Sequence, residues 1–197
     1  MIGGIILAAG SSRRFGGDKR RSLLPSGQTL LEATIFKALT CLPAILVVLR
    51  DGDEAFADQL MKSIKDSRVK YYMAPDSAQG MAHSLANSIN QVQDWEAALV
   101  LLGDMPFLET RTIEQILDTY AGEVSRKTNP APIIVPCLDA KFGHPVLFSQ
   151  RYFEEIVMLK GDRGARPVID AHPENLVTLV VTDKGVLLDV DRPADLD

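Results

Sequence analysis

The residues that could do chemistry gather first near the N-terminus. The apolar run 5–9 ends in Gly10-Ser11-Ser12, and five cations follow within the next nine residues: Arg13, Arg14, Lys19, Arg20 and Arg21. Small residues let a backbone approach a ligand closely, and free N–H groups with fixed cations bind phosphates. The segment is therefore a polyphosphate-binding loop or, on charge alone, a solvated basic loop after a buried strand.

A carboxylate in the middle of the chain could hold a cation beside such phosphates. Asp104 follows the apolar run 97–102 and Gly103, and Pro106 stops any return to regular structure. The Asp104 side chain would then project from the end of a buried strand, where it could bind Mg²⁺. This ion typically binds only one or two protein carboxylates. Alternatively, Asp104 caps the helix expected at residues 109–121, for which Thr110 is a competing cap.

A second pair of carboxylates lies near the C-terminus. Asp189 and Asp191 are two residues apart, so they face the same way in an extended segment, and either could be a second metal ligand. The alternative is that Asp191 caps a short terminal helix with Pro193 near its start.

Three further segments combine glycine with polar side chains. His144, in Gly143-His144-Pro145, could bind a phosphate, orient a substrate or be structural. The glycine-bracketed segment 161–166 carries two arginines, which suit bidentate binding of phosphate or carboxylate if it is not simply a surface loop. Residues 79–84 begin an amphipathic helix whose first N–H groups could contact a base or a phosphate.

These residues must be positioned by alternating strands and helices. Strands are expected at 2–8, 44–49, 69–73, 97–102, 133–136, 145–148, 177–181 and 186–188, and several are continuous apolar runs typical of strands covered on both faces. Helical apolar faces occur at 31–42, 56–64, 81–92 and 113–120. The alternation predicts an α/β domain with a mostly parallel sheet, and residues 125–132 are expected to be a surface loop.

Ligands of such sheets bind beyond the carboxyl ends of the strands, where the loop at 9–21 would lie. Neither G-x-G-x-x-G nor G-x-x-x-x-G-K-[ST] occurs there, which excludes a dinucleotide-type Rossmann site and a P-loop.

Composition describes an ordinary globular protein of one domain, with 197 residues of which 46% are hydrophobic and 24% charged. A net charge of -5 argues against a general nucleic-acid binder. No apolar run approaches the ~20 residues that span a bilayer, and no signal peptide is expected. Cys41 and Cys137 fit buried thiols in a reducing cytoplasm, so a cytoplasmic protein is expected.

Together the motifs resemble the molybdenum-cofactor cytidylyltransferase group of the nucleotidyltransferases. The pattern L-A-A-G-x-S-x-R-[MF]-G-x-x-K matches residues 7–19, and L-L-P matches 23–25. G-M-x-x-S-L matches 80–85, G-D-M-P 103–106, G-H-P-V 143–146, G-D-x-G-A-R 161–166 and D-x-D-x-P-x-D 189–195. Seven motifs in the right order make a chance match improbable.

The resemblance implies a single nucleotidyltransferase domain over 1–197, with a three-layer α/β/α Rossmann-like fold. Its N-terminal half would bind nucleotide and its C-terminal half the acceptor. The implied nucleotide-binding residues are Leu7, Ala8, Ala9, Gly10, Ser11, Ser12, Lys19, Leu24, Pro25, Gly80 and Ser84. Lys19, Arg14 and Asp104 would be catalytic, Asp104 and Asp191 would hold Mg²⁺, and His144 and Arg166 would bind the acceptor.

The implied reaction transfers CMP from CTP to the phosphate of molybdopterin or its metal-loaded form, releasing pyrophosphate. Related guanylyltransferases carry L-A-G-G in the first loop and end in N-x-N-T-P, whereas this chain has L-A-A-G at 7–10 and D-V-D-R-P at 189–193. Alternatives are GTP as donor, a sugar or polyol phosphate as acceptor, or a non-catalytic carrier. The partners would be CTP, a molybdopterin-type cofactor and a molybdoenzyme client, without nucleic acid or membrane.

Overall fold

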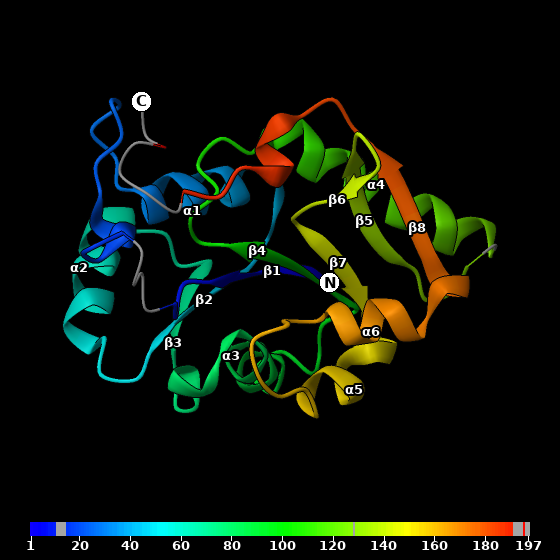
Figure 1. The fold of residues 1–197 in the computed structure, drawn as a ribbon, viewed down its shortest axis with the longest axis horizontal. Helices are drawn as coiled ribbons and strands as arrows, with labels where there is room; N and C mark the ends of the chain where they lie inside the picture. Colours follow the sequence, from blue (N-terminus) through cyan, green and yellow to red (C-terminus); the bar gives the residue numbers. More distant parts are fainter. Residues whose placement is uncertain (11–14, 128, 191–194, 196–197) are drawn as a thin grey trace.

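The computed structural model describes residues 1–10, 15–127, 129–190 and 195. Within these residues, eight strands form one mixed sheet in the order β3-β2-β1-β4-β7-β5-β6, and β8 pairs with β5 (Figure 1). The strands are β1 (Ile2–Leu7), β2 (Ile45–Arg50), β3 (Val69–Ala74), β4 (Ala97–Leu102), β5 (Ile133–Leu138), β6 (Lys141–Phe142), β7 (Val146–Ser149) and β8 (Leu176–Val180). The four strands from β3 to β4 are parallel, whereas β7 is antiparallel to both β4 and β5.

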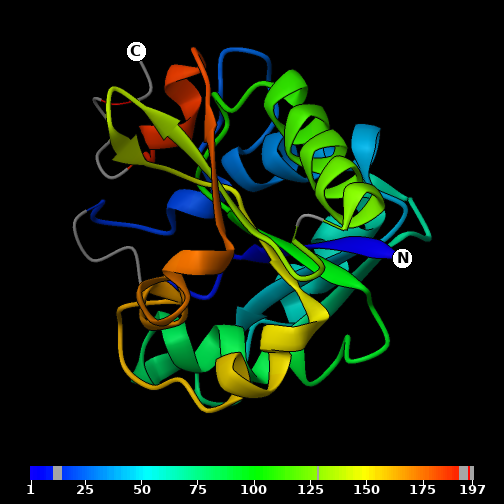
Figure 2. The ribbon, with the colours of Figure 1, turned by 90° about the vertical axis from the view of Figure 1, so that its right-hand side faces the viewer.

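Helices cover both faces of the sheet (Figure 1). They are α1 (Leu30–Cys41), α2 (Glu54–Ile64), α3 (Met81–Ile89), α4 (Thr110–Arg126), α5 (Phe153–Val157) and α6 (Arg166–Ala171). Short 3₁₀ helices are η1 (Lys19–Arg21), η2 (Ser77–Gln79), η3 (Gln150–Tyr152), η4 (Pro173–Asn175) and η5 (Lys184–Leu187). In the turned view of Figure 2, the sheet runs between α4 on one side and α3 and α5 on the other.

Two apolar cores result from the alternation of strand side chains. Ile6 of β1 belongs to the core formed with α1, α2 and α4, whereas its neighbour Ile5 belongs to the core formed with α3, α5 and α6. Both faces of the central strands are therefore buried, which explains their continuous apolar runs. The predicted three-layer α/β/α fold with a mostly parallel sheet is confirmed.

Most predicted elements are confirmed, with one clear error. Residues 186–188 were expected to be a strand, but they lie in and directly after η5. The Asp183 carboxylate accepts the N–H of Gly185 at 2.7 Å, and this cap favours a helical turn over an extended segment. The surface loop expected at 125–132 also starts later, because α4 continues to Arg126 and ends at Lys127 in the left-handed conformation.

The structure also bears on the cysteines and on membrane-spanning helices. Cys41 and Cys137 are both free thiols, so they do not form a disulfide. Cys137 is buried as expected, whereas Cys41 is only half-buried. Among the described residues, no helix combines the length and the apolar character that crossing a membrane would need.

Candidate active site

The main cavity lies where the strand order reverses. β2 and β3 lie on one side of β1, and β4 lies on the other, so the strand order reverses at β1, and described residues that follow β1 and β4 line a crevice at the carboxyl edge of the sheet. The crevice is a cavity of about 830 Å³. The predicted nucleotide-binding residues Leu7, Ala8, Ala9, Gly10, Lys19, Gly80 and Ser84 all line it, together with Asp104.

Lys19 and Asp104 meet inside this cavity. The Lys19 ammonium lies 2.5 Å from the Asp104 carboxylate and also donates to the carbonyl of Val190 at 2.9 Å. Gly103, just before Asp104, lets the end of β4 lie close to the end of β1. Its N–H donates to the Leu7 carbonyl at 2.9 Å, and a Cβ at this position would lie only 3.0 Å from the Ala8 side chain. The cation and the carboxylate predicted from two distant motifs are thus brought together.

The donor set at Asp104 suits a divalent metal ion. Its Oδ1 is buried and has no hydrogen-bond partner among the described residues. Asp189 lines the same cavity, whereas Asp191, the predicted partner in metal binding, lies outside the described residues. Within the described part of the chain, no three metal-ligating side chains cluster.

The start of α3 forms another wall of the cavity. Gly80 has φ +125°, a value that side-chain-bearing residues rarely adopt, and a Cβ there would lie 2.5 Å from the carbonyl oxygen of Gly161. The N–H of Ala82 donates to that same carbonyl at 2.9 Å. Ser84 is buried and its hydroxyl faces the Gly80 carbonyl. The segment at 161–166 therefore docks on the first turn of α3.

A second, smaller cavity of about 130 Å³ adjoins the first and shares Leu7 and Met81 with it. His144 and Arg166, the predicted acceptor-binding residues, both line it among mainly apolar side chains. Burial lowers the pKa of His144, although the Asp104 and Asp189 charges partly oppose this, so the imidazole is neutral at pH 7. Its Nδ1 is buried without a partner among the described residues.

Arg166 is exposed at the edge of this second cavity. Its guanidinium donates to Asp170 at 2.7 Å and lies 5.6 Å from the centre of the Phe142 ring. Asp170 and Phe142 therefore orient the guanidinium at this edge, and its role toward an acceptor stays a prediction.

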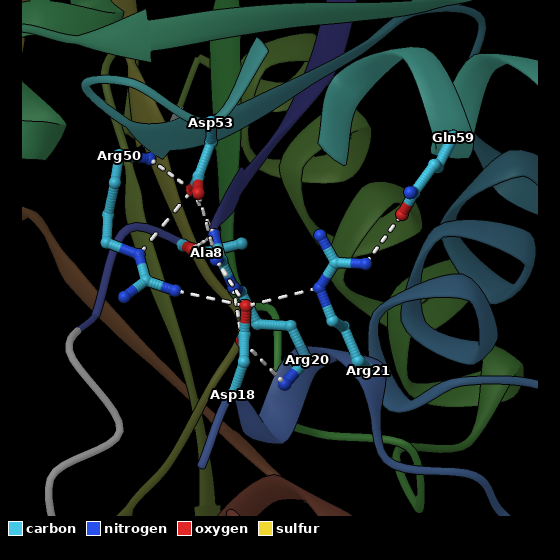
Figure 3. A network of polar contacts seen from close by, with 7 residues as sticks. All are labelled: Ala8, Asp18, Arg20, Arg21, Arg50, Asp53 and Gln59. Atoms are coloured by element: carbon cyan, nitrogen blue, oxygen red, sulfur yellow. Dashed lines mark hydrogen bonds and ion pairs between the residues drawn. The ribbon is translucent and has the colours of Figure 1, made fainter. Parts of the chain in front are cut away.

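Arg20 lines the main cavity but is committed to the protein (Figure 3). Its guanidinium donates twice to Asp18, twice to Asp53 and once to the carbonyl of Ala8. A guanidinium has five N–H donors, so none remains for a phosphate. The phosphate-binding interpretation of the five cations therefore does not extend to Arg20.

Arg21 is also engaged elsewhere. Its guanidinium carbon lies 4.2 Å from the centre of the Phe56 ring. Arg21 also donates to Gln59 at 2.5 Å (Figure 3). Of the five cations that follow the first strand, Arg13 and Arg14 lie outside the described residues, and Lys19 is the described one that meets Asp104 in the cavity.

Some predicted site residues are not brought to either cavity. Leu24 and Pro25 lie in a turn closed by a hydrogen bond from the Leu24 N–H to the Gln28 carbonyl, and neither residue lines either of the two cavities described above. Ser11 and Ser12 lie outside the described residues, as does Arg14. Their roles remain predictions.

Sequence reasoning missed Met81 and Arg50. Met81 is common to both cavities, and the Arg50 guanidinium lines the larger one while donating to Asp18 at 3.1 Å. Met81 stands next to Gly80 in a recognised motif, so a signal for it existed. Arg50 ends an ordinary strand, and its sequence neighbours give no such signal.

Comparison with known proteins agrees with this geometry. The family model described as "MobA-like NTP transferase domain" matches residues 4–176. The purine catabolism protein PucB of Bacillus subtilis is 27% identical, over 98% of this chain and 93% of its own. A probable molybdenum cofactor guanylyltransferase of Chloroflexus aggregans is 34% identical, over 55% of this chain and 48% of its own.

Solved structures extend the comparison. The crystal structure of Rv0371c from Mycobacterium tuberculosis has a TM-score of 0.77 and 28% identity, covering 99% of this chain and 95% of that one. A complex of Rv0371c with manganese has a TM-score of 0.68 and 26% identity, covering 100% and 92% of the two chains. The cavity at the reversal of strand order, the paired Lys19 and Asp104 and the matched family model lead to one conclusion: this chain belongs to the MobA-like NTP transferase family and is a nucleotidyltransferase.

Proposed function

We propose that this enzyme transfers CMP from CTP to the terminal phosphate of molybdopterin, or of its metal-loaded form, and releases pyrophosphate. The observation that carries the proposal is the joining of two cavities at Leu7 and Met81. The larger cavity contains the Lys19–Asp104 pair, and the smaller one contains His144 and Arg166. A nucleotide in the first and an acceptor in the second would have their phosphates adjacent.

The acceptor oxygen attacks the α-phosphorus in line, and the bond to the leaving pyrophosphate breaks. A phosphate monoester is already an anion at pH 7, so no strong general base is needed. Catalysis then rests on positioning and on neutralising charge. Lys19 donates to the α-phosphate or the departing pyrophosphate, and Arg14 is proposed to assist it. A divalent cation such as Mg²⁺, held by Asp104 with Asp191 or Asp189, would neutralise further phosphate charge.

The choice of CTP rests on the first loop. Its L-A-A-G sequence at 7–10 is typical of the cytidylyltransferase group, and Ala8 and Ala9 line the cavity. The partial match to a relative named as a guanylyltransferase favours GTP as the second candidate donor. A sugar or polyol phosphate stays the alternative acceptor.

Residues 1–197 would act as one domain, in which the N-terminal half holds the nucleotide and the C-terminal half the acceptor. The enzyme would work in the cytoplasm and pass its product to a molybdoenzyme client. The Lys19–Asp104 pair favours catalysis over a carrier role, because a carrier does not need to neutralise a triphosphate.

The test is pyrophosphate release with Mg²⁺ and each of CTP, GTP, ATP and UTP, with and without molybdenum cofactor. We expect release that requires both CTP and the cofactor. Asp104→Asn should lose most of this activity without unfolding. Asp66→Asn is the matched control, since Asp66 pairs with Arg68 just before β3, at the amino edge of the sheet.

Each outcome decides between the candidates. Pyrophosphate release that requires GTP and the cofactor would make GTP the donor in place of CTP. Binding of the cofactor without any pyrophosphate release would favour a non-catalytic carrier. Full turnover by Asp104→Asn at saturating Mg²⁺ would refute the role of Asp104 in metal binding.

A further inference from the structure

The segment 183–190, which we call the C-terminal bridge, runs along both halves of the site. It starts at the buried Asp183, includes η5 and ends at Val190. Its contacts reach the start of α4, the Gly143–His144 step and the Lys19–Asp104 pair. The last two of these places carry the proposed acceptor and metal chemistry, and all three come from separate parts of the sequence.

Asp183 anchors the bridge. Its side chain is 4% exposed, and three donors satisfy it. One oxygen accepts the N–H of Glu109 at 2.9 Å and the Thr112 hydroxyl at 2.7 Å, and the other accepts the N–H of Gly185 at 2.7 Å. A buried carboxylate with these partners fixes the bridge to the first turn of α4, which follows Asp104 in the chain.

The middle of the bridge holds the acceptor side. A Cβ on Gly185 would lie 2.4 Å from the carbonyl oxygen of Phe107, so this part of the bridge lies directly on another backbone. The next carbonyl, that of Val186, accepts the N–H of His144 at 2.9 Å. A Cβ on Gly143 would lie 2.4 Å from that same Val186 oxygen. His144 is thus placed by the backbone of the bridge.

The end of the bridge holds the metal side. The N–H of Val190 donates to the Asp104 carbonyl at 3.0 Å, and the Val190 carbonyl accepts from the Lys19 ammonium at 2.9 Å. The side chain of Val190 is fully buried, and Asp189 lines the cavity immediately before it. The backbone of one residue therefore contacts both members of the Lys19–Asp104 pair.

We propose that Asp183 is a positioning residue, which keeps the bridge in register so that Asp104 and Asp189 face a divalent cation, Lys19 faces the nucleotide phosphates and His144 faces the acceptor. Asp183 touches neither substrate. Its effect on turnover rests on the proposed nucleotidyl transfer, whereas its effect on metal affinity does not. Supporting groups of this kind typically change metal affinity or activity about 10–100-fold when removed.

The test compares Asp183→Asn with Gly185→Ala. The first removes the anchoring charge, and the second pushes the bridge away from Phe107 while leaving every charge in place. Ser149→Ala is the matched control, because the Ser149 hydroxyl is buried and donates to the Pro132 carbonyl at 2.7 Å, away from the bridge. All variants are compared below their unfolding transitions.

The main measurement is Mn²⁺ binding, followed by the loss of the free Mn²⁺ electron paramagnetic resonance signal, with and without CTP. We expect both bridge variants to bind Mn²⁺ about tenfold more weakly or worse. Amide hydrogen exchange should rise at His144 and Val190 in both variants but not in Ser149→Ala.

Unchanged Mn²⁺ binding in the bridge variants would overturn the proposal, as would binding by the unaltered protein too weak to measure. A loss of Mn²⁺ affinity in Ser149→Ala equal to that in Asp183→Asn would also overturn it, since that loss would reflect stability alone. A further outcome separates the two proposals. If the unaltered protein binds Mn²⁺ but transfers no nucleotide, and both bridge variants bind Mn²⁺ more weakly than it does, the positioning role of Asp183 stands and the proposed function fails.

Discussion

Replacing Arg20 tests whether the first loop is held by a structural cation. Its guanidinium makes five hydrogen bonds, four to carboxylates and one to a backbone carbonyl. Lysine has three donors on one nitrogen, so Arg20→Lys keeps the charge but loses at least two of these bonds. Hydrogen bonds to charged groups contribute about 1.5–3 kcal/mol each. Asp18 and Asp53 are 25% and 18% exposed, which favours the lower end of this range.

We therefore expect Arg20→Lys to lower the free energy of unfolding by about 3 kcal/mol, the value for two such bonds at the lower end of this range. Arg20→Met leaves both carboxylates without their main partner and should cost about 3–5 kcal/mol. For a chain of this size, each kcal/mol corresponds to roughly 2–4 °C in melting temperature. Urea unfolding followed by circular dichroism measures the first quantity, and a thermal scan measures the second.

Arg21→Lys is the matched control. Arg21 is the adjacent residue of the same type, but 45% of its side chain is exposed and its nearest carboxylate lies at 3.5 Å. It should lose less than about 1 kcal/mol. Equal losses at the two positions, or a loss below about 0.5 kcal/mol in Arg20→Lys, would refute the structural role.

The same network predicts how stability depends on pH. Burial raises the pKa of Asp18 and of Asp53, but hydrogen bonds and charge from Arg20, with help from Arg50, outweigh it and leave both below 3.8. Stability from such carboxylates is present above pH 3.8 and is lost as pH falls through their folded-state values. Removing the guanidinium in Arg20→Met should flatten this acid-side decline. An unchanged decline would show that other groups cause it.

Two further predictions concern other parts of the site and the surface. Gly80→Ala should raise the nucleotide KM and lower stability by about 1–2 kcal/mol or more, because the new Cβ strains the backbone and meets Gly161. Gly52→Ala is the control, because Gly52 also has a positive φ but has open space around it. Steady-state kinetics should show an unchanged nucleotide KM in this variant. A hydrogen bond to Glu155 raises the pKa of His172 above 6.5, so this contribution to stability is complete below pH 6.5 and declines as pH rises through the folded value. His172→Gln should remove that decline when unfolding free energies at about pH 6 and about pH 8 are compared.

The fold was largely predictable because its signals are local. Continuous apolar runs mark strands buried on both faces, and helical periodicity marks the covering helices. The error at 186–188 has a non-local cause. Val186 and Leu187 read as strand residues, but η5 is held by the Asp183 carboxylate, whose other donors lie on Glu109 and Thr112. An isolated aspartate in the sequence gives no sign of such distant partners.

In the site, too, the features with local sequence signals could be predicted, whereas those that depend on distant contacts could not. Sequence motifs predicted Lys19, Asp104 and His144, and the structure places all three along the two cavities, because glycines and strand ends show where side chains can meet a ligand. They could not show which cations are already paired, since Arg20 is satisfied in part by Asp53, 33 residues further along the chain. Charge density near a phosphate loop thus overstates its phosphate-binding capacity. A buried cation whose donors are all taken by partners within the protein, as those of Arg20 are, adds nothing to ligand binding, and only long-range contacts show which cations these are.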